Sequence, residues 1–423
     1  MKYDTIIIGG GLSGLMAGVK LARSGSKVAI ISSGQSALHF HSGSFGLLGH
    51  ADGKELLHPL EAIGTLPAGH PYSKIGAESI PALADDAKQI FADAGLTFIG
   101  DSSKNHFRLT PLGLCEPSWL TMDDYATCEN PSETGWRKAT IINFKGFLDF
   151  LPGFLADGLK KHNLPCDYAE ITLPAIERLR RNSSEMRAAA IAKVLKGPVL
   201  EMLASEINRA AGNSDVVFMP AVVGIDSEQP VRELRSMVIP KLLCVPVLPM
   251  SVCGMRSQIR LRRYFEQLGG TYFLGDNVTR GYMEGPALKE IETANLSGMS
   301  LQADNFILAT GSFFSQGLVA EPDRIYEPVL GADVEAPSDR SLWCGKSIFD
   351  NQPYMQFGVT TDRDFHVMFN GIPAGNVYAV GAILGGSNPI REGSGGGVAI
   401  LSALQVARNI IAAGRADNSE AQA

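Results

Sequence analysis

Cysteine is scarce in this sequence and is not grouped. The chain has six cysteines in 423 residues, with no Cys-x-x-Cys pair and no paired-His spacing of the kind that binds zinc. We therefore expect no metal site, whether an iron–sulfur cluster or a structural zinc, held by this chain alone. A chain of this size does not need disulfides, so we interpret the thiols as reduced. They are Cys115, Cys128, Cys166, Cys244, Cys253 and Cys344.

Charge and long apolar runs are also limited. Charged residues make up 19% of the chain and the net charge is −7, which gives no electrostatic case for nucleic-acid binding. No apolar run reaches the ~18 residues that a membrane-spanning helix needs. The apolar stretch 6–19 is interrupted by Gly9–Gly11, which argues against a signal peptide. We expect any membrane association to come through a partner or a surface patch.

Glycine, in contrast, is abundant. The chain has 46 glycines, with clusters at Gly9–Gly14, Gly43–Gly49 and Gly393–Gly397. Clustered glycine is typical of backbone that turns sharply or lies close to a ligand. The length suggests two or three compact units.

The first thirty residues predict a β-α-β unit. Tyr3–Ile8 is a short apolar run rich in isoleucine, Ser13–Ser24 has helical periodicity, and Lys27–Ile31 is a second apolar run. Two parallel strands joined by a helix indicate a doubly wound α/β sheet.

Similar elements return late in the chain. We predict helices over Arg256–Leu268 and 396–412, and strands over Thr271–Leu274, Asn305–Ala309 and Val377–Val380. The region 60–245 is richer in proline at its start, with strands predicted at Val216–Pro220 and Leu242–Val247. Its different composition indicates an inserted second domain.

The motif Gly9-x-Gly11-x-x-Gly14 lies between the first strand and the first helix. Gly9 permits a tight turn, Gly11 lets the backbone approach a phosphate, and Gly14 lets the helix pack on the strand. The free N–H groups and the positive end of the helix then face the anion. We predict a nucleotide or phosphate site that includes Gly10, Leu12 and Ser13 as well.

The end of the second strand lacks an acidic residue. Dinucleotide sites place Asp or Glu there to bind the adenosine ribose, whereas this sequence has Ser32-Ser33-Gly34. The gap counts against NAD and conventional FAD and fits FMN, which has no adenosine. The glycine loop argues the other way, because in related folds it holds the pyrophosphate of FAD.

Three further segments are candidates for the cofactor site. The small and polar residues around Ser42 and Gly43 follow the second strand, Thr310-Gly311 ends a later strand, and Gly381 to Gly396 is rich in glycine. A helix beginning at Gly395 and Gly396 would be open to an anion or a polar ring edge. His39 and His41 suggest catalysis or covalent flavin attachment, but in a loop they are more often plain hydrogen-bonding residues.

Four segments carry a resemblance to a known family. Gly34–Phe40, Ala309–Ser315, Gln356–Asp362 and Gly393–Gly397 resemble the B subunit of anaerobic glycerol-3-phosphate dehydrogenases, within the two-domain flavoproteins, over essentially the whole chain. The resemblance implies an FMN-associated subunit, with FAD as the alternative. It also implies two partners, a catalytic flavoprotein as the A subunit and a membrane-anchoring iron–sulfur protein as the C subunit. This chain would then be peripheral on the cytoplasmic side of the inner membrane.

That family's complex oxidises sn-glycerol 3-phosphate to dihydroxyacetone phosphate and passes electrons through quinone toward fumarate or nitrate. The alternative is a non-catalytic scaffold that keeps the flavoprotein fold. The sequence identifies no general base, so the catalytic residues stay unknown. Candidate cations for a substrate phosphate are Arg256, Arg260, Arg262 and Arg391.

We therefore predict a doubly wound Rossmann-like flavin-binding domain with an inserted second α/β or α+β domain. Residues 1–60, 246–320 and 366–413 form the flavin-binding domain and 61–245 the inserted one. Residues 321–365 return to the second domain or connect the two, and 414–423 form a frayed tail. The expected cofactor-binding residues are Gly9, Gly10, Gly11, Leu12, Ser13, Gly14, Ser32, Ser33, Gly34, Ser42, Gly43, Thr310, Gly311, Gly381, Gly395 and Gly396.

Overall fold

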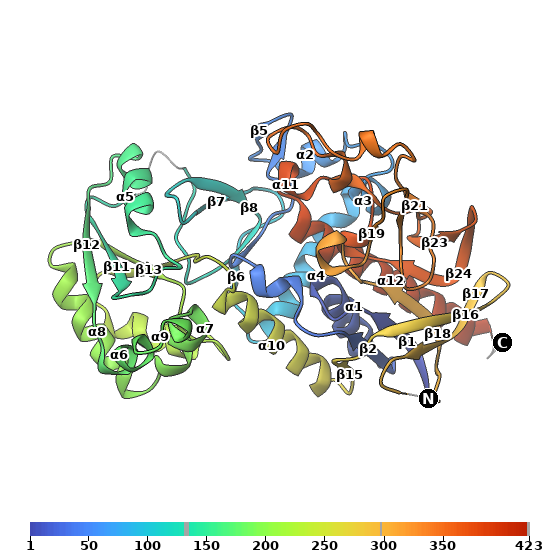
Figure 1. Ribbon diagram of the computed structural model, residues 1–423, viewed down its shortest axis with the longest axis horizontal. Helices are drawn as coiled ribbons and strands as arrows, with labels where there is room; N and C mark the ends of the chain where they lie inside the picture. The colour runs from blue at the N-terminus through green and yellow to red at the C-terminus, as the bar shows by residue number, and fades with distance from the viewer. Residues whose placement is uncertain (131–134, 297, 421–423) are drawn as a thin grey trace. The chain divides into compact units, whose positions relative to one another are not determined.

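The chain divides into two compact units. The structure, a computed structural model, describes residues 1–130, 135–296 and 298–420. Unit 1 comprises Met1–Ala37, Gly46–Ala94 and Leu261–Ala423, and unit 2 comprises Leu38–Phe45 and Gly95–Arg260. Figure 1 labels their elements along the chain.

Unit 1 is built on an eight-stranded sheet. Its strand order is β15-β2-β1-β18-β17-β16. Strand β24 also pairs with β18, and β23 pairs with β24. The pairs β15–β2, β2–β1, β1–β18 and β18–β24 are parallel, which confirms the α/β class predicted from the first thirty residues. The strands are β1 (Lys2–Ile8), β2 (Val28–Ser32), β15 (Thr271–Leu274), β16 (Val278–Glu284), β17 (Ala287–Thr293), β18 (Leu301–Leu308), β23 (His366–Phe369) and β24 (Ile372–Ala379).

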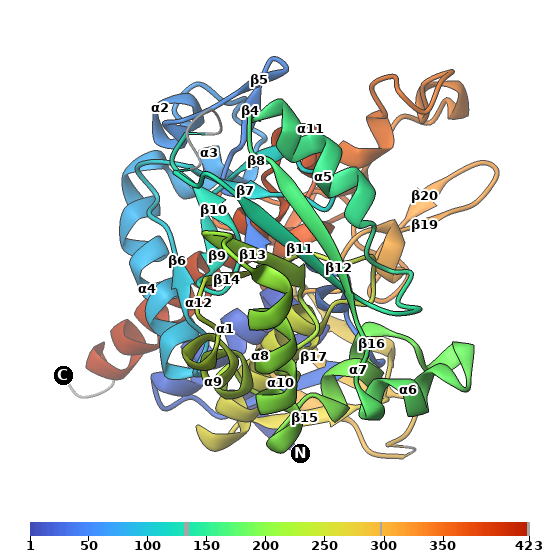
Figure 2. The same ribbon diagram turned by 90° about the vertical axis from the view of Figure 1, so that its left-hand side faces the viewer.

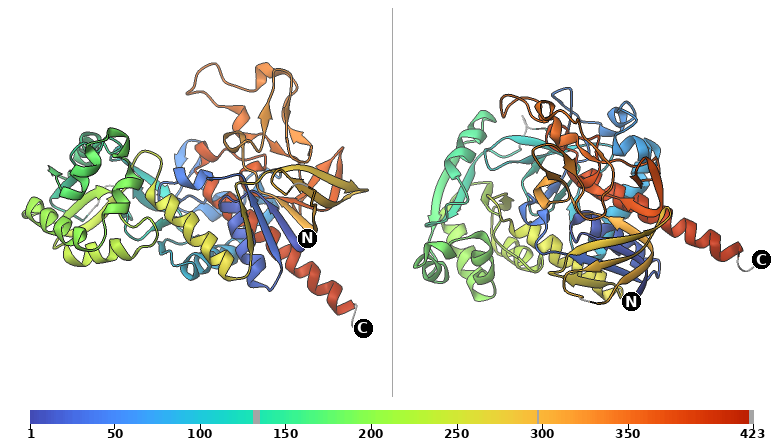
Figure 3. Two further views of the ribbon diagram at one scale, coloured as in Figure 1. Left: turned by 60° about the horizontal axis from the view of Figure 1, so that its bottom comes forward. Right: turned by 45° about the vertical axis from the view of Figure 1, so that its right-hand side comes forward.

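Helix α1 (Leu12–Arg23) contacts the central strands β1 and β2, and a long C-terminal helix packs on α1. The fully buried Ile6 and Ile7 show that β1 is a core strand, as its unbroken apolar run predicts. Helix α1 (Leu12–Arg23) packs on α12 (Gly395–Glu420), and α12 also contacts α3 (Pro71–Ile75) and α4 (Ile80–Asp93). Figure 3 shows α12 in red, leaving the body of unit 1 only at its C-terminal end.

Helix α12 is longer than the sequence analysis predicted. It continues through Glu420, so residues 414–420 of the expected frayed tail are helical, and 421–423 lie outside the described residues. Among the described residues, one segment, Gly395–Arg415, is long and apolar enough to cross a membrane by length and composition, with 67% of its apolar window buried. That burial is typical of a core helix.

Unit 2 contains a parallel four-stranded sheet of order β12-β11-β13-β14. Two small antiparallel sheets, β10-β7-β8 and β3-β9-β6, accompany it. Figure 2 brings this unit toward the viewer. Its strands are β3 (Ser44–Phe45), β6 (Phe98–Ile99), β7 (His106–Leu109), β8 (Cys115–Ser118), β9 (Leu120–Met122), β10 (Thr127–Cys128), β11 (Ala139–Phe144), β12 (Cys166–Ile171), β13 (Val216–Pro220) and β14 (Lys241–Val245).

The helices of unit 2 include α5 (Pro152–Lys161), α6 (Pro174–Arg180), α7 (Ala188–Val194), α8 (Pro198–Ala211) and α9 (Gln229–Met237). Helix α10 (Val252–Gln267) starts one turn before Arg256, the start predicted from the sequence. The division between unit 2 and unit 1 falls within this helix, after Arg260. Short elements complete unit 1: β4 (His50–Ala51), β5 (Lys54–Glu55), α2 (Pro59–Ile63), β19 (Val319–Ala320), β20 (Ile325–Tyr326), β21 (Val334–Glu335), β22 (Gly358–Val359) and α11 (Pro389–Glu392).

The unit boundaries differ from those expected from the sequence. Residues 61–94 and 321–365 belong to unit 1, whereas 38–45 and 246–260 belong to unit 2. The first shift has a clear cause, since α4 buries Leu83, Ala87 and Ile90 and contacts α12 and α1. An amphipathic helix shows in the sequence that it needs a partner, but not which partner it takes.

Candidate functional site

The turn between β1 and α1 depends on two of its glycines for packing. Gly9 has φ +119°, and a Cβ on it would lie 2.2 Å from the carbonyl oxygen of Ala309. A Cβ on Gly14 would lie 1.9 Å from the carbonyl oxygen of Gly9. Neither position can hold a side chain without moving backbone, so these glycines bring β1, α1 and the end of β18 together.

Gly11 is different, because the space beside it is open. It is the N-cap of α1, and the atom nearest to a Cβ built there is Ser36 Cβ at 3.8 Å. The helix has no side-chain cap and no acidic residue in its first turn, and Leu15 N–H donates to Gly11 O at 2.9 Å. The N–H groups of Leu12 and Ser13 precede that hydrogen bond, so this helix end is available to an anion.

The end of β2 carries a hydroxyl in place of a carboxylate. Ser32 Oγ donates to Gly34 O at 3.2 Å, and Ser33 is exposed. Tyr272 on β15 donates its hydroxyl to Gly10 O at 3.2 Å. A Cβ on Gly10 would lie 2.0 Å from that hydroxyl oxygen and 2.6 Å from Ser32 Oγ. The sequence analysis did not predict Tyr272 as a neighbour of Ser32, because nothing in the sequence of Thr271–Leu274 indicates that this strand pairs with β2.

The end of β18 holds a polar atom without a hydrogen-bond partner. Thr310 Oγ1 is buried and unpaired among the described residues, and Thr310 N would lie 3.0 Å from a Cβ on Gly9. Gly311 has φ +81°, and a Cβ on it would lie 2.2 Å from Ser315 Oγ. An orphaned hydroxyl next to the glycine turn is the kind of group that a bound phosphate or ribityl hydroxyl would satisfy.

The structure brings Gly381 to the first turn of α1. Gly381 has φ +77°, and a Cβ on it would lie 2.0 Å from Ser13 Oγ. Its N–H donates to Ser402 Oγ at 2.9 Å, which ties it to α12. Gly381 and Ser13, 368 positions apart in the printed sequence, therefore belong to one cluster.

A partly buried carboxylate supports the start of α12. Glu392 accepts hydrogen bonds from His70 Nε2 at 3.2 Å, Ser394 Oγ at 2.7 Å and the Asn388 N–H at 2.9 Å. Burial raises the pKa of Glu392, but these hydrogen bonds outweigh it, and the net pKa lies below its usual value. The Tyr72 N–H donates to His70 Nδ1 at 3.1 Å, so Nε2 carries the proton shared with Glu392.

This carboxylate network positions the first residues of the helix. Val398 N–H donates to Ser394 O at 2.9 Å and Gly397 N–H donates to Gly46 O at 2.8 Å. The N–H groups of Gly395 and Gly396 come before the first hydrogen bond of the helix, so no carbonyl within the helix accepts them. They are therefore available to a ligand at this second helix start. Sequence reasoning selected these glycines but missed His70 and Glu392, which lie 322 positions apart.

Four other candidates from the sequence lie in unit 2. A Cβ on Gly43 would lie 2.6 Å from Tyr125 Cζ, and Ser42 Oγ is 3.4 Å from Ser44 Oγ. His41 donates from Nε2 to Ser44 O at 2.5 Å and accepts the Gly43 N–H at Nδ1 at 3.2 Å. Burial lowers the pKa of His41 to about 4, so it is neutral and both its nitrogens are engaged. The pKa of His39 is also lowered by burial, although Gln258 opposes the shift.

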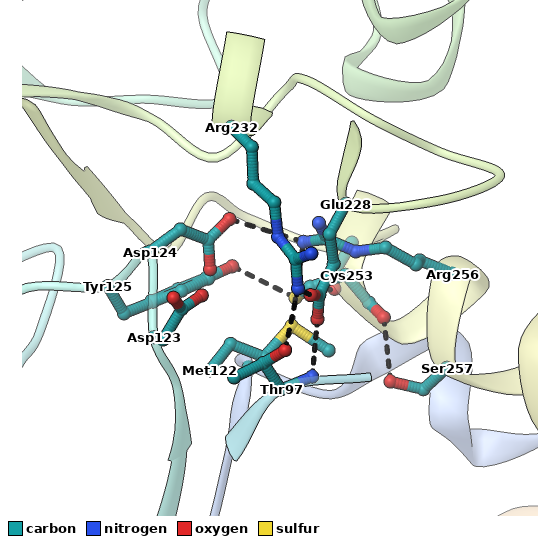
Figure 4. Close-up of polar contacts among 12 residues, drawn as sticks. Thr97, Met122, Asp123, Asp124, Tyr125, Glu228, Arg232, Cys253, Arg256 and Ser257 are labelled. Atoms are coloured by element: carbon teal, nitrogen blue, oxygen red, sulfur yellow. Dashed lines mark hydrogen bonds and ion pairs between the residues drawn. The ribbon is translucent and has the colours of Figure 1, made fainter. Parts of the chain in front are cut away.

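The four candidate arginines differ sharply in environment. Arg256 is 1% exposed, and its Nη2 lies 3.4 Å from Asp124 Oδ2, as Figure 4 shows. Its Nε and Nη1 have no hydrogen-bond partner among the described residues. Burial opposes its charged form, but Asp124 next to it raises the pKa of Arg256 above its usual value. Arg262 pairs with Glu266 at 2.9 Å, Arg391 is exposed, and Arg260 is partly exposed.

No metal centre accompanies these residues. Within the three described ranges, no group of three or more His, Cys, Asp or Glu side chains could hold a metal ion.

Comparison with known proteins finds one family over most of the chain. The family described as FAD binding domain matches residues 4–398. The B subunit of the anaerobic glycerol-3-phosphate dehydrogenase of Yersinia enterocolitica is 41% identical over 98% of this chain and 99% of its own length. The proteins of the same name from Pectobacterium carotovorum and Actinobacillus succinogenes are each 39% identical, over 98% and 97% of this chain and 100% and 99% of their own lengths.

Two solved structures are also similar at low sequence identity. The 3-ketosteroid delta1-dehydrogenase of Sterolibacterium denitrificans is 12% identical over 97% of this chain and 100% of its own, with a TM-score of 0.44. Sdh1 of Mycobacterium smegmatis is 10% identical over 98% of this chain and 69% of its own, with a TM-score of 0.42.

Proposed function

This chain belongs to the FAD binding domain family and, within it, to the B subunits of the anaerobic glycerol-3-phosphate dehydrogenases, and on that premise we propose that it carries a flavin in such a complex. The complex oxidises sn-glycerol 3-phosphate to dihydroxyacetone phosphate. Its other members are a catalytic flavoprotein, the A subunit, and an iron–sulfur protein, the C subunit. The iron–sulfur protein attaches the complex to the cytoplasmic face of the inner membrane and passes electrons to quinone.

The observation that carries this proposal is the open start of α1. Gly11 has free space beside it, whereas its neighbours Gly9 and Gly14 are closed in by backbone. Packing does not require glycine at position 11, and this position of the motif is the one where the backbone comes close to a bound phosphate. We assign the flavin phosphate to the N–H groups of Leu12 and Ser13, with Thr310 Oγ1 as a further partner.

The bound flavin would supply a redox centre that accepts and passes on electrons within the complex. The chain's own residues bind and orient it. The first turn of α1 holds its phosphate, Gly381 lets the β24 end lie against Ser13, and the Gly395–Gly396 helix start places a positive dipole end in the same unit. No described residue is assigned as the general base.

We propose FMN as the flavin. Ser32 provides no charge for an adenosine ribose, and the Tyr272 hydroxyl fills space between it and Gly10. Mass spectrometry of the cofactor released by denaturation should then find FMN. Stoichiometric FAD, which the family match and the glycine loop favour, would overturn this assignment.

The absence of a carboxylate at Ser32 also favours a second candidate, a scaffold that keeps the fold without a flavin. The visible spectrum of the purified chain separates the two, because a bound flavin absorbs visible light and a scaffold does not. A colourless protein after purification under gentle conditions, and after incubation with FMN and FAD, would refute the flavoprotein function.

The complex itself is tested by assembling it in steps. We expect the chain alone to show little glycerol 3-phosphate oxidation with an artificial dye, and the pair with the catalytic flavoprotein to show activity. Sedimentation with membranes should require the iron–sulfur protein. Full turnover by the isolated chain would show that it is a self-sufficient dehydrogenase.

A further inference from the structure

An arginine in the small β10-β7-β8 sheet of unit 2 has no acidic partner. Arg108 lies on the middle strand of this sheet, opposite Glu116 on β8 and Thr127 on β10, and Figure 2 labels the three strands. Its Nη1 donates to Leu109 O at a long 3.4 Å. Among the described residues, no ion pair joins Arg108 to a carboxylate, that of Glu116 included. This guanidinium therefore has bonding capacity that the chain does not use.

The unused edge of this guanidinium is the one that binds oxyanions. In an arginine side chain the N–H groups of Nε and Nη2 point the same way and form a fork that holds two oxygens of one phosphate or carboxylate. The Nε of Arg108 is buried and has no hydrogen-bond partner in the described part of the chain. Its bond to Leu109 O comes from Nη1, so the fork stays open. The residue is partly exposed, which lets a small ligand reach it.

The positive charge of Arg108 is not compensated within the chain. Burial lowers its pKa, and the attraction of nearby groups, Glu116 among them, does not outweigh that effect. Arg256 in the same unit shows the opposite balance, because Asp124 beside it more than offsets burial and raises its pKa (Figure 4). A buried charge without a counter-charge costs free energy, and such groups cluster at binding sites where a ligand supplies the missing charge.

Three titratable neighbours of Arg108 are uncharged at neutral pH. Burial, with a smaller effect of the Arg108 charge, lowers the pKa of His41 and of His106 to about 4, so both imidazoles are neutral. Burial raises the pKa of Tyr125 well above its usual value, so its phenol keeps its proton. These neighbours neither cancel the charge of Arg108 nor repel an anion that approaches it.

A phosphate monoester is the ligand class that fits this fork best. It presents two oxygens to the fork and carries a charge of about −1.5 to −2 at pH 7, more than a carboxylate brings. The complex to which we assign the chain converts one phosphate monoester, sn-glycerol 3-phosphate, into another, dihydroxyacetone phosphate, so this inference rests on the proposed function. The flavin phosphate is assigned to the start of α1 in unit 1 and does not compete for Arg108.

We propose that Nε and Nη2 of Arg108 bind the phosphate group of a small phosphate monoester, the substrate or product of the complex. The site belongs to this chain alone, because both donors come from one side chain of unit 2. The inference concerns binding, and the oxidation stays with the catalytic flavoprotein.

The test is a calorimetric titration of the full chain, with its flavin bound, by sn-glycerol 3-phosphate, inorganic phosphate or glycerol. We expect the ester to bind more tightly than inorganic phosphate, and glycerol not to bind. Arg108→Gln should weaken binding of the ester at least about tenfold. Arg108→Lys keeps the charge but loses the fork, so its loss should be smaller. Arg178→Gln, at an exposed arginine of unit 2, is the matched control and should bind as the original chain does.

Thermal melts of the same samples separate binding from a structural role. Arg108→Gln removes a buried charge that has no partner, so without ligand its melting temperature should rise by about 1–2 °C. Addition of sn-glycerol 3-phosphate should then raise the melting temperature of the original chain and of the control, but not that of Arg108→Gln. If Arg108→Gln does not fold, the affinity of the Arg108→Lys protein decides the test.

Three outcomes would overturn the proposal. Equal binding of the ester by the original chain and both Arg108 variants, or no binding by the original chain, refutes this inference. Neither result affects the proposed function, which the flavin content and the activity of the pair with the catalytic flavoprotein test separately. A lower melting temperature of both variants without ligand would show a structural role for Arg108. Inorganic phosphate that binds as tightly as the ester would assign the site to free phosphate.

Discussion

Replacing Gly11 by valine tests whether the start of α1 binds the cofactor phosphate. A Cβ at this position meets Ser36 Cβ at 3.8 Å, an ordinary contact, so we expect the substitution to leave the packing of unit 1 largely intact. Its branched side chain would instead occupy the space in front of the Leu12 and Ser13 N–H groups. We expect a folded protein that has lost its flavin.

The size of the effect follows from the two N–H groups. A hydrogen bond to a charged group contributes roughly 1.5–3 kcal/mol, so losing both costs about 3–6 kcal/mol of binding free energy. At ~1.4 kcal/mol per tenfold change, the Kd for flavin should rise by about two to four orders of magnitude. The folding cost should be ~1 kcal/mol, because valine is a poor N-cap.

The assay is a flavin titration of the apoprotein followed by fluorescence quenching, with a thermal melt of each sample. Gly69→Val is the matched control, since a Cβ on Gly69 meets no atom within 4 Å. Gly14→Ala should behave in the opposite way and destabilise the fold, because its Cβ would lie 1.9 Å from Gly9 O. A Gly11→Val protein with full flavin occupancy would refute the reasoning.

Further substitutions test the networks around the site. Glu392→Gln should lower stability by about 2 kcal/mol in a chemical-denaturation experiment, because an amide has a single acceptor oxygen and cannot replace both Oε2, which accepts from His70 and Ser394, and Oε1, which accepts the Asn388 N–H; Glu177→Gln on the surface should not lower stability. The carboxylate pKa is lowered on folding, so this stabilisation should be present above the pKa of an unfolded glutamate and lost in acid; equal losses at every pH would contradict it. His41 has a folded pKa of about 4, so the unfolded chain takes up a proton near pH 6.5 that the folded chain does not, and stability should fall as the pH drops from 6.5 toward 4, by up to about 3 kcal/mol. His41→Phe, which can still stack on Phe45, should reduce the pH dependence of the melting temperature in that window without abolishing it, because burial also lowers the pKa of His106 to about 4; an unchanged slope would count against a buried neutral His41.

The sequence by itself determined the local elements of unit 1. The isoleucine run of β1, the amphipathic α1 and the glycines between them predict the first β-α-β unit, because strand burial, helix periodicity and turn geometry depend on neighbouring residues. The space beside Gly11 is open, and the phosphate-binding role that its place in the motif predicts stays a prediction. The missing carboxylate at Ser32 could also be recognised from the sequence, because its place is counted from the glycine motif.

The tertiary structure decided what depends on residues far apart in the chain. It assigned α4 to unit 1, brought Tyr272 to Gly10 and paired His70 with Glu392. It also separated Arg256, which is buried with unpaired donors, from three arginines that look alike in the sequence. Burial and pairing are set by which surfaces meet when the chain folds, and a local pattern of residues does not encode that choice.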